Sequence, residues 1–569
     1  MIHCRSKFLK KHAMPNVHDL THTVSNQPPD FLGTNLYAGD QVLRHWLDAL
    51  GGSWGHERAM AYGELAGGRL MELGFLANAN KPVLRSHDRF GHRLDQVEFH
   101  PAYHEIMATA ISHGLPSLPW TRPGEGAQVV RAALTYLHGQ AEAGTCCPLT
   151  MTYASVPALR NQPEVAEQWL PKILSTDYDG RFLPLADKHG ATIGMGMTEK
   201  QGGSDVRANT TRATPVSQSG PGQPYKLVGH KWFFSAPMCD AFLVLAQSER
   251  GLSCFLVPRF QPDGSQNAIR IQRLKDKLGD HANASSEVEF FEAWAVMVGE
   301  EGRGVPTILE MVMHTRLDCM IGSASLMRQA LSQAVHHAKH RQAFGRLLSD
   351  QPLMQNVLAD LALESEAALA MTLRLASALD AAAQGDTEEA ALARVLTAVG
   401  KYWICKRTPM MVNEAQECLG GAGYVEESIL PRLYRQAPLN SIWEGSGNIQ
   451  CLDVLRALSR EPDSLPAITR ELGIGAAEHA GLAERVEQLG QALADRDQIE
   501  TRARALVEEL AVCLQASLLV RSAPGFVAEA FMAGRFGGGR VFGTLPAGLA
   551  YEAILDLSLI HISEPTRPY

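Results

Sequence analysis

Apolar residues recur every three or four positions over most of residues 35–185, and this spacing predicts a mainly helical N-terminal part. Clusters of proline and glycine, such as LPSLPWTRPGEG, separate the expected helices. Clear examples of the helical spacing are Leu43, Trp46, Leu47 and Leu50, followed later by Val129, Val130, Ala133, Leu134 and Leu137.

The pattern changes near Gly194, and from Tyr225 to Val298 the chain offers short β-rich runs separated by turn signals. The runs are YKLVGHKWFFSA, AFLVLAQ, LSCFLVPRF, IRIQRL and SSEVEFFEAWAVMV. Short strands at this spacing predict a small β-barrel or sandwich. From Val305 to Leu458 long stretches rich in alanine, leucine and methionine are helical in pattern again.

A further helical section follows a break at residues 461–466 (EPDSLP). One amphipathic stripe there consists of Leu482, Val486, Leu489 and Leu493, and another of Leu506, Leu510, Cys513, Leu514 and Leu518. We therefore expect an α+β, mostly helical fold. Its expected parts are an N-terminal extension (1–34), a helical domain (35–190), a β-domain (191–300), a helical bundle (301–460), an added helical module (461–557) and a tail (558–569) that resembles translated sequencing-adapter sequence.

Length and composition narrow the class of protein. A chain of 569 residues with 45% hydrophobic residues is too long for one domain. The net charge of −9 argues against a protein that coats nucleic acid or anionic membrane with its whole surface. The ten cysteines form no CxxC pair and no zinc-like Cys/His cluster, so we expect reduced thiols, no metal and a cytoplasmic location. We also expect no signal peptide and no membrane span, because no apolar run is long enough.

Two candidate ligand-binding segments flank the start of the β-rich region. In MGMTEKQGGSD (Met195–Asp205), Thr198 and Ser204 supply hydroxyls, and the glycines let backbone N–H groups approach a ligand. The alternative is an ordinary glycine-rich turn. In GHKWFFSAP (Gly229–Pro237), a tryptophan and two phenylalanines could form the floor for a flat aromatic cofactor, and the alternative is a plain core strand.

Three more segments lie in the second helical region. Arg341 in RQAFG, with Gln351 downstream, could pair with a pyrophosphate, or could be a solvated arginine at a helix end. The cluster LGGAGY (Leu419–Tyr424) permits close backbone approach, but helix precedes it, so it is no nucleotide fingerprint. Glu444 lies between Trp443 and Gly445. A carboxyl beside a large ring is partly desolvated, which raises its pKa towards that of a base, whereas an isolated glutamate is usually a surface residue.

The order and spacing of these segments, from about Val129 to Leu458, resemble the acyl-CoA dehydrogenase superfamily. MGMTEKQGGSD, KWFFS, RQAFG, LGGAGY and SIWEGSGNIQ match that family's motifs in the correct order, and Arg316 in HTRLDCMIGSA matches a helix start. Within the superfamily the resemblance is to the branch associated with the bacterial adaptive response to DNA alkylation. It is carried by HTVSNQPP, TCCPLTMTYA, LVGHKWFFSAP, LSCFLVPRFQPDG, RLKDKLGDHANAS and the C-terminal module.

The resemblance implies a helical domain, a β-domain and a helical bundle that assemble as a homotetramer, with FAD between the β-domain and the bundle. It places Glu444 as the base that removes the α-proton of an acyl thioester. Arg341 and Gln351 would reach a pyrophosphate, by implication that of a neighbouring subunit. The implied cofactor-binding residues are Met195, Gly196, Met197, Thr198, Ser204, Trp232, Phe233, Phe234, Ser235, Arg341, Gln351, Ile442, Trp443, Gly445, Ser446, Gly447 and Asn448.

Several positions depart from the family pattern. Phe234, followed by Ser235, stands where most members have threonine, Gln436 replaces the usual aspartate, and Glu417 replaces the usual glutamine. Lys200-Gln201 also replaces a loop that is often rich in proline. These departures favour the adaptive-response branch over a dedicated enzyme of fatty acid catabolism.

The same branch implies binding of duplex DNA through the C-terminal module, by Arg456, Arg521, Arg535 and Arg540. The charge there is unfavourable, since residues 461–569 hold 9 arginines and no lysine against 15 acidic residues, a net of −6. The alternative is a set of solvated or ion-paired arginines.

Three functional hypotheses follow. The first is an FAD-containing protein of the adaptive response that binds duplex DNA and protects it from alkylating agents or destroys them, with weak acyl-CoA (isovaleryl-CoA-like) dehydrogenase activity. The second is a catabolic short- or branched-chain acyl-CoA dehydrogenase without a DNA role. The third is a flavin-binding scaffold with no turnover.

Overall fold

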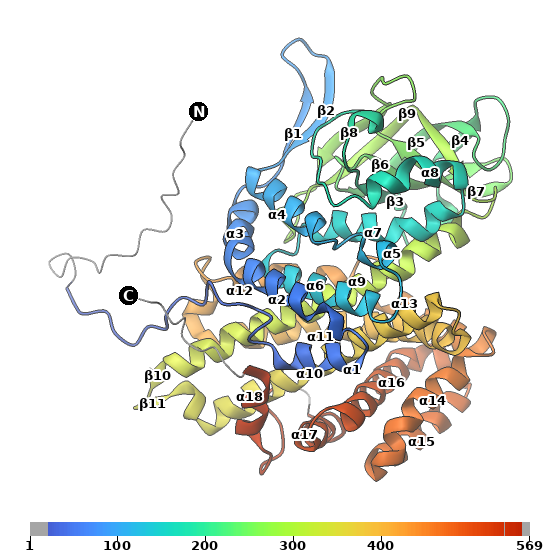
Figure 1. The fold of residues 1–569 in the computed structure, drawn as a ribbon. Coiled ribbons are helices and arrows are strands. Elements are labelled where there is room, and N and C mark those ends of the chain that lie inside the picture. Colours follow the sequence, from blue (N-terminus) through green and yellow to red (C-terminus); the bar gives the residue numbers. More distant parts are fainter. Residues whose placement is uncertain (1–20, 540, 560–569) are drawn as a thin grey trace.

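The computed structural model describes residues 21–539 and 541–559, in which a β-domain lies between two helical regions along the chain (Figure 1). The expected α+β, mostly helical fold with a central β-domain is confirmed. None of the described helices combines the length and the apolar character that a membrane crossing requires.

The N-terminal region is helical except for one hairpin that the pattern did not predict. Strands β1 (Val83–His87) and β2 (Arg93–Glu98) pair antiparallel and project from the body (Figure 1). Asp88 closes the turn by accepting backbone N–H bonds from Phe90 and His92. The helices are α1 (Gln41–Ala49), α2 (His56–Leu65), α3 (Met71–Ala79), α4 (Pro101–Ser112), α5 (Leu118–Thr121), α6 (Ala127–Ala141), α7 (Cys146–Arg160) and α8 (Pro163–Ile173).

The β-domain is a barrel, because its strand pairings run in the order β6, β4, β5, β9, β7 and back to β6. Strand β3 adds to β6 in parallel, and β8 adds to β9. Its inward side chains, among them Phe234, Phe242 and Phe290, form a hydrophobic core that is continuous with buried residues of α7 and α8. The strands are β3 (Ile193–Gly196), β4 (Arg212–Pro215), β5 (Pro224–Ser235), β6 (Ala241–Ser248), β7 (Gly251–Pro258), β8 (Ile269–Leu274) and β9 (Ser285–Val298).

Three long helices form the centre of the bundle: α9 (Gly304–His340), α10 (Pro352–Ala383) and α11 (Thr387–Leu419). Asp386 caps α11 by accepting the N–H groups of Glu388 and Glu389, as an N-cap aspartate is expected to do. A small hairpin, β10 (Gln342–Ala343) and β11 (Arg346–Leu347), joins α9 to α10. Helices α12 (Leu430–Gln436) and α13 (Gly447–Arg460) complete the bundle.

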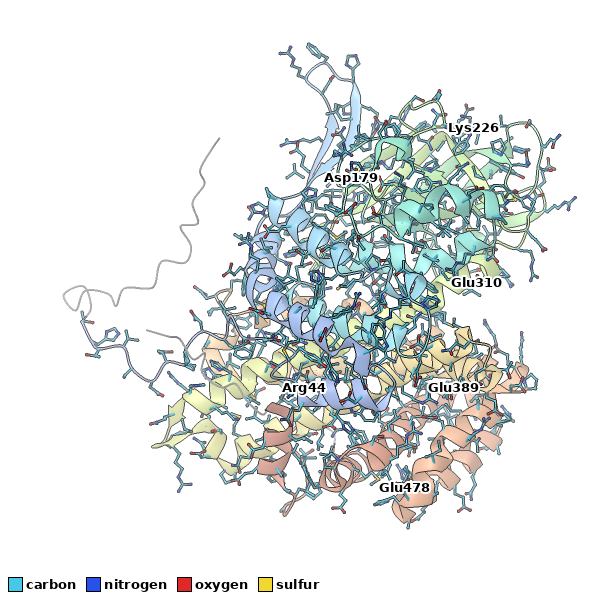
Figure 2. The ribbon with its side chains drawn as sticks, in the orientation of Figure 1. Arg44, Asp179, Lys226, Glu310, Glu389 and Glu478 are labelled. Carbon is cyan, nitrogen blue, oxygen red and sulfur yellow. The ribbon has the colours of Figure 1, made fainter. Side chains whose placement is uncertain are left out.

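The C-terminal module packs on this bundle through α14 (Ser464–Glu478), α15 (Ala480–Ala494), α16 (Ile499–Ser522), α17 (Gly525–Phe536) and α18 (Tyr551–Leu559). Both predicted stripes face inward: Leu482 and Leu489 of α15 are buried, and so is the whole stripe of α16. Charged side chains such as Glu310 and Glu478 lie at the periphery (Figure 2). Helix α18 includes Ser558, the first residue of the predicted tail, and residues 560–569 lie outside the described residues. The division into domains that the sequence suggested remains our proposal.

A strap, defined here as residues 24–31, runs from the N-terminal extension across the end of α9. The side-chain amide of Asn26 exchanges two hydrogen bonds with the backbone of Gln342, at 2.9 and 2.7 Å. The carbonyl of Asn26 accepts a bond from Arg341, and the carbonyl of Pro29 accepts one from His336. Chain segments more than 300 residues apart in sequence are thereby joined.

Candidate active site

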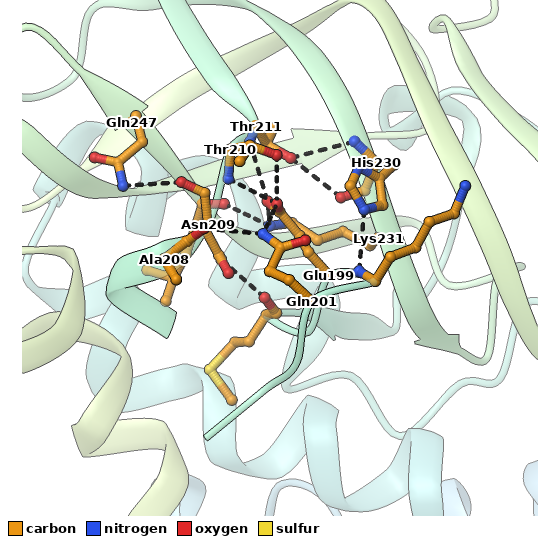
Figure 3. A network of polar contacts seen from close by, with 12 residues as sticks. Glu199, Gln201, Ala208, Asn209, Thr210, Thr211, His230, Lys231 and Gln247 are labelled. Carbon is orange, nitrogen blue, oxygen red and sulfur yellow. Dashed lines mark hydrogen bonds and ion pairs between the residues drawn. The ribbon is translucent and has the colours of Figure 1, made fainter. Parts of the chain in front are cut away.

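A buried ion pair fastens the first two predicted segments to each other. The ammonium of Lys231, on β5, lies 2.8 Å from a carboxylate oxygen of Glu199, and both side chains are fully buried (Figure 3). Glu199 also accepts the backbone N–H groups of Thr210 and Thr211. The lysine and these donors hold the pKa of Glu199 well below its usual range, although burial opposes this. The pair fixes the loop after β3 against β5.

Glu199→Gln tests this clamp. The variant leaves the Lys231 ammonium buried without a carboxylate, so the free energy of unfolding should fall by roughly 3–5 kcal/mol. Denaturant unfolding at pH 7 measures the change. Because the folded-state pKa of Glu199 is depressed, the wild-type advantage should be present above the unfolded pKa of about 4.3 and shrink as the pH falls below it. The exposed Glu300→Gln is the control, and equal stability of the two variants would contradict the clamp.

An aromatic and cationic surface adjoins this clamp. The backbone N–H of Trp232 donates to the backbone carbonyl of Thr198, so the two segments lie side by side. Trp232 is half-buried, and Phe233 is 54% exposed. The ammonium of Lys275 lies 3.4 Å from the centre of the Trp232 ring and 4.6 Å from that of Phe233. Exposed ring faces flanked by cations suit an aromatic ligand that carries phosphate.

Phe234 corrects one part of the prediction. Its ring is fully buried and packs on Phe242 in the barrel core, with ring centres 4.1 Å apart. A ring in that position cannot line a flavin. The reason is an irregularity in the β5–β9 register between Lys231 and Phe234, which turns Phe234 back to the inner face. The hydroxyl of the next residue, Ser235, lies 3.1 Å from that of Ser285.

The loop that carries Glu444 joins the turn Leu439–Ser441 to α13, and its backbone is held in an uncommon conformation. Glu444 has φ of 57° and Gly445 has φ of 93°, two successive left-handed residues. A non-glycine residue with positive φ is uncommon and is frequent at functional sites. The carbonyl of Glu444 accepts bonds from Arg316 of α9 and Gln450 of α13. The strained turn is therefore fixed from two helices.

The carboxyl of Glu444 points to α9, where the hydroxyl of Thr315 donates to it at 2.7 Å. Burial raises the pKa of Glu444, whereas the Thr315 hydrogen bond and the charges of Arg316 and Lys401 lower it. A carboxyl with a raised pKa is suited to accept a proton near neutral pH.

The Glu444 loop lies where the bundle meets the β-domain. Trp443 packs against the hydrophobic cluster that the β-domain shares with α7, α8 and the start of α9, and its indole N–H donates to Asn440. Ile442 is 64% exposed. At the other end of the loop Asn448 accepts a bond from Arg504 of α16, so the C-terminal module also contacts this loop. Gly447 begins α13, and Ser446 is exposed before it.

Arg341 and Gln351 lie at the far end of the bundle from this junction, beside β10 and β11 (Figure 1). Gln351 donates to the carbonyl of Ala343 and so supports the hairpin. Phe344 at the hairpin tip is 98% exposed. The Thr198 and Trp232 segments thus lie side by side in one chain, whereas Glu444 contacts α9 and Gln351 supports the hairpin after it.

Of the arginines predicted to face DNA, two are ion-paired inside the protein and one is exposed. Arg535 lies inside the protein between Asp360 and Glu364, 2.7 Å from each. Arg521 is mostly buried and bonded to Glu471. Both predictions are wrong, because internal carboxylates occupy these guanidinium groups. Arg456 is exposed on α13 and forms no ion pair with any described residue, and Arg540 lies outside the described residues.

The sequence analysis missed three residues at this junction: Thr315, Lys401 and Lys275. Thr315 directly precedes Arg316 in a segment already matched to the family. Lys401 had a usable signal, since it is a single lysine in the mostly apolar run AVGKYWIC of α11. Lys275 lies in RLKDKLGDHANAS, a segment already matched to the family, but nothing in that segment indicates its contact with Trp232, which only folding creates.

Three family models match the chain. They are the adaptive response protein AidB N-terminal domain at residues 26–180, the acyl-CoA dehydrogenase middle domain at residues 194–293, and the acyl-CoA dehydrogenase C-terminal domain at residues 302–459. The chain belongs to the acyl-CoA dehydrogenase family, whose members are FAD-dependent oxidoreductases.

Within that family the chain is similar to the protein named "Putative acyl-CoA dehydrogenase AidB" of Escherichia coli (strain K12). The two are 50% identical over 448 residues, which are 78% of this chain and 82% of the relative. Acyl-CoA dehydrogenase family member 11 of Caenorhabditis elegans is 30% identical over 462 residues, 77% of this chain and 73% of the relative.

Solved structures agree with the fold. The structure of Caenorhabditis elegans ACDH-11 in complex with C11-CoA has a TM-score of 0.82 at 26% identity, and covers 91% of this chain and 94% of that one. The structure described as Bd2924 apo-form has a TM-score of 0.80 at 29% identity, and covers 88% of this chain and 99% of that one.

The residues at the junction fit the FAD that the family uses. Trp232 and Phe233 offer aromatic surface, and Lys275 and Arg273, each 2.7 Å from Glu287, lie within 6 Å of the Trp232 ring. The loop after β3 is packed closely, since a Cβ on Gly203 would lie 2.3 Å from the hydroxyl oxygen of Thr198. An aromatic wall, nearby cations and a compact glycine loop together suit a flavin dinucleotide.

Proposed function

We propose that the chain oxidises the Cα–Cβ bond of an acyl-CoA and that Glu444 is the base. The observation that carries this proposal is the partly desolvated carboxyl of Glu444 beside the junction of the β-domain and the bundle. Bound FAD supplies the two-electron oxidant. Met195–Thr198, Trp232 and Phe233 would line one side of it, with Ile442 and Trp443 closing the other. Glu444 takes the α-proton of the acyl group.

We further propose a short or branched acyl group. Thr315 and Asp318 are one turn apart on α9, and the space around Asp318 is filled by buried polar side chains. Arg131 and Thr150 bond to Asp318, and the hydroxyl of Tyr153 lies 2.9 Å from the ring of His314. These polar contacts one turn from Thr315 are the support for a short or branched acyl group.

The assembly that we propose is a homotetramer in which Arg341 and Gln351 act on the FAD of a neighbouring subunit. Thr315, which contacts Glu444, lies near the start of α9 and Arg341 directly follows its end, and this separation within one chain supports the arrangement. In this proposed assembly a neighbouring subunit also covers the exposed Phe344 beside them.

We propose that the physiological role lies in the adaptive response to DNA alkylation, with duplex DNA as a partner and with protection of DNA from alkylating agents, or their destruction, as the outcome. The support is the match to the adaptive response N-terminal domain and the 50% identity to AidB. On this chain the DNA contact no longer rests on Arg521 or Arg535. It rests on Arg456, which is exposed.

Fluorescence anisotropy with a labelled duplex, over a salt series, tests the DNA role, and the visible spectrum of the same sample reports flavin. We expect flavin absorbance together with an affinity that falls steeply as salt rises, because phosphate contacts release counterions. Arg456→Ala should weaken binding and reduce the salt slope by about one. Flavin absorbance without DNA binding at low salt would leave the catabolic alternative, and anaerobic bleaching of the flavin by isovaleryl-CoA would then identify it.

A further inference from the structure

Lys401 forms hydrogen bonds to the backbone carbonyls of the two residues on either side of Glu444. It lies on α11 and its side chain is buried. Its ammonium donates to the carbonyl oxygen of Trp443 at 2.7 Å and to that of Gly445. An ammonium has three donors, so this one side chain directs two of them to the residues that flank the candidate base.

The charge of Lys401 has no carboxylate of its own. No carboxylate in residues 21–539 or 541–559 lies within the 4.0 Å of an ion pair from this ammonium. Several other buried cations are paired with carboxylates, as Lys231 is with Glu199 and Arg131 with Asp318, whereas Arg259 is also held by backbone carbonyls. Carbonyl groups accept the hydrogen bonds of an ammonium but carry no opposite net charge, and in a medium of low polarity a charge acts over a longer range than in water.

The other groups around Glu444 do not replace this charge. From α9, Arg316 bonds to the Glu444 carbonyl but is also paired with Asp453 of α13, which binds Arg394 as well. Cys319 of α9 is a buried thiol whose pKa is raised well above its usual value by burial. Lys401 is therefore the cation near Glu444 that no acidic contact offsets.

We infer that Lys401 is a positioning residue for the reaction that we assign to Glu444. It holds the left-handed turn that presents the carboxyl, and it supplies a fixed positive charge beside it. The inference rests on the proposed function. Two physical effects follow from it. Without the hydrogen bonds of Lys401, the two successive residues with positive φ, Glu444 and Gly445, lose the support that α11 provides. Without the charge, the carboxylate is less favoured, so a higher pH is needed to generate the base.

Two variants separate the clamp from the charge. Lys401→Met removes both the donors and the charge, whereas Lys401→Gln removes the charge and keeps a neutral N–H donor on a side chain one bond shorter. Lys406→Met is the matched control, because Lys406 is exposed on the same helix. The absorbance of bound FAD is recorded from about pH 5 to 10 in each purified holoenzyme, with Glu444→Gln as the reference that identifies the inflection due to Glu444.

We expect the inflection to move up by about one pH unit in both Lys401 variants and to stay in place in Lys406→Met. Amide hydrogen exchange of residues 443–445 should accelerate about tenfold in Lys401→Met and less in Lys401→Gln. An unmoved inflection in both variants, with unchanged exchange, would overturn the inference. A wild-type inflection that persists in Glu444→Gln would instead count against Glu444 as the base, and the exchange rates would still decide whether Lys401 holds the turn.

Discussion

Replacing Glu444 by glutamine should reduce the rate at which an acyl-CoA bleaches the bound flavin by roughly 10³-fold, since a positioned general base contributes about 10²–10⁴-fold. The amide keeps the size of the side chain and can still bond to Thr315, so the loop should remain in place. Anaerobic stopped-flow mixing of the holoenzyme with isovaleryl-CoA measures the rate.

The control for this prediction is Glu427→Gln, an exposed glutamate that precedes the same loop. It should bleach at the wild-type rate. The flavin content of both variants, read from the visible spectrum, should equal that of the wild type. A Glu444→Gln protein with full flavin content and a wild-type bleaching rate would remove Glu444 from the reaction.

Replacing Arg535 by methionine should lower the free energy of unfolding by roughly 3–5 kcal/mol, because it leaves buried carboxylates without their cation. Arg535 lies 2.7 Å from both Asp360 and Glu364, and Arg407 is a second partner of Glu364 at 2.9 Å. Denaturant unfolding at pH 7 measures the loss.

The pH dependence of that loss has a definite sign. The two arginines lower the pKa of Glu364 to about 2, against the burial that would raise it. The resulting stability is present above the unfolded pKa of about 4.3 and is lost as the pH falls towards 2. The difference between wild type and Arg535→Met should therefore shrink in acid. The exposed Arg456→Met should stay within about 0.5 kcal/mol of the wild type at every pH, and a similar result for Arg535→Met would contradict a buried cluster.

The contrast between Arg535 and Arg456 also affects how a DNA-binding assay is interpreted. Loss of DNA binding in an Arg535 variant would follow from damage to the packing between α17 and α10 and would say nothing about phosphate contacts. Arg456, whose removal leaves no buried charge, gives an interpretable result.

Hydrophobic periodicity predicted the elements that pack one regular face against a single neighbour. The stripes of α15 and α16 follow a regular helix against one packed neighbour, so their spacing was sufficient. The hairpin β1–β2 was missed because its tip projects from the body and only Asp95 and Val97 of its strands are buried, which leaves only weak alternation. Phe234 was placed on the wrong face because one irregularity in β5 shifts the alternation, and that irregularity depends on the partner strand β9.

In the candidate site, too, some residues were predictable from the sequence and others were not. Glu444, Thr198 and Trp232 were found from local motifs that the family resemblance orders along the chain. The state of Arg535 was not predictable, because its partners Asp360 and Glu364 are more than 170 residues away in sequence. The clamp by Lys401 likewise joins α11 to a loop 42 residues further on, and no local spacing reports that contact.

The strap that joins Asn26 to Arg341 and Gln342 sets an order of events during synthesis. Residues 24–31 leave the ribosome among the first, but their partners on α9 and in the hairpin are made 316 residues later. At a translation rate of about 5–20 residues per second, the partners of the strap are synthesised roughly 15 to 60 seconds after the strap itself. Its closure is therefore a late step, and a chain that stops short of residue 342 would carry this segment undocked and open to proteolysis.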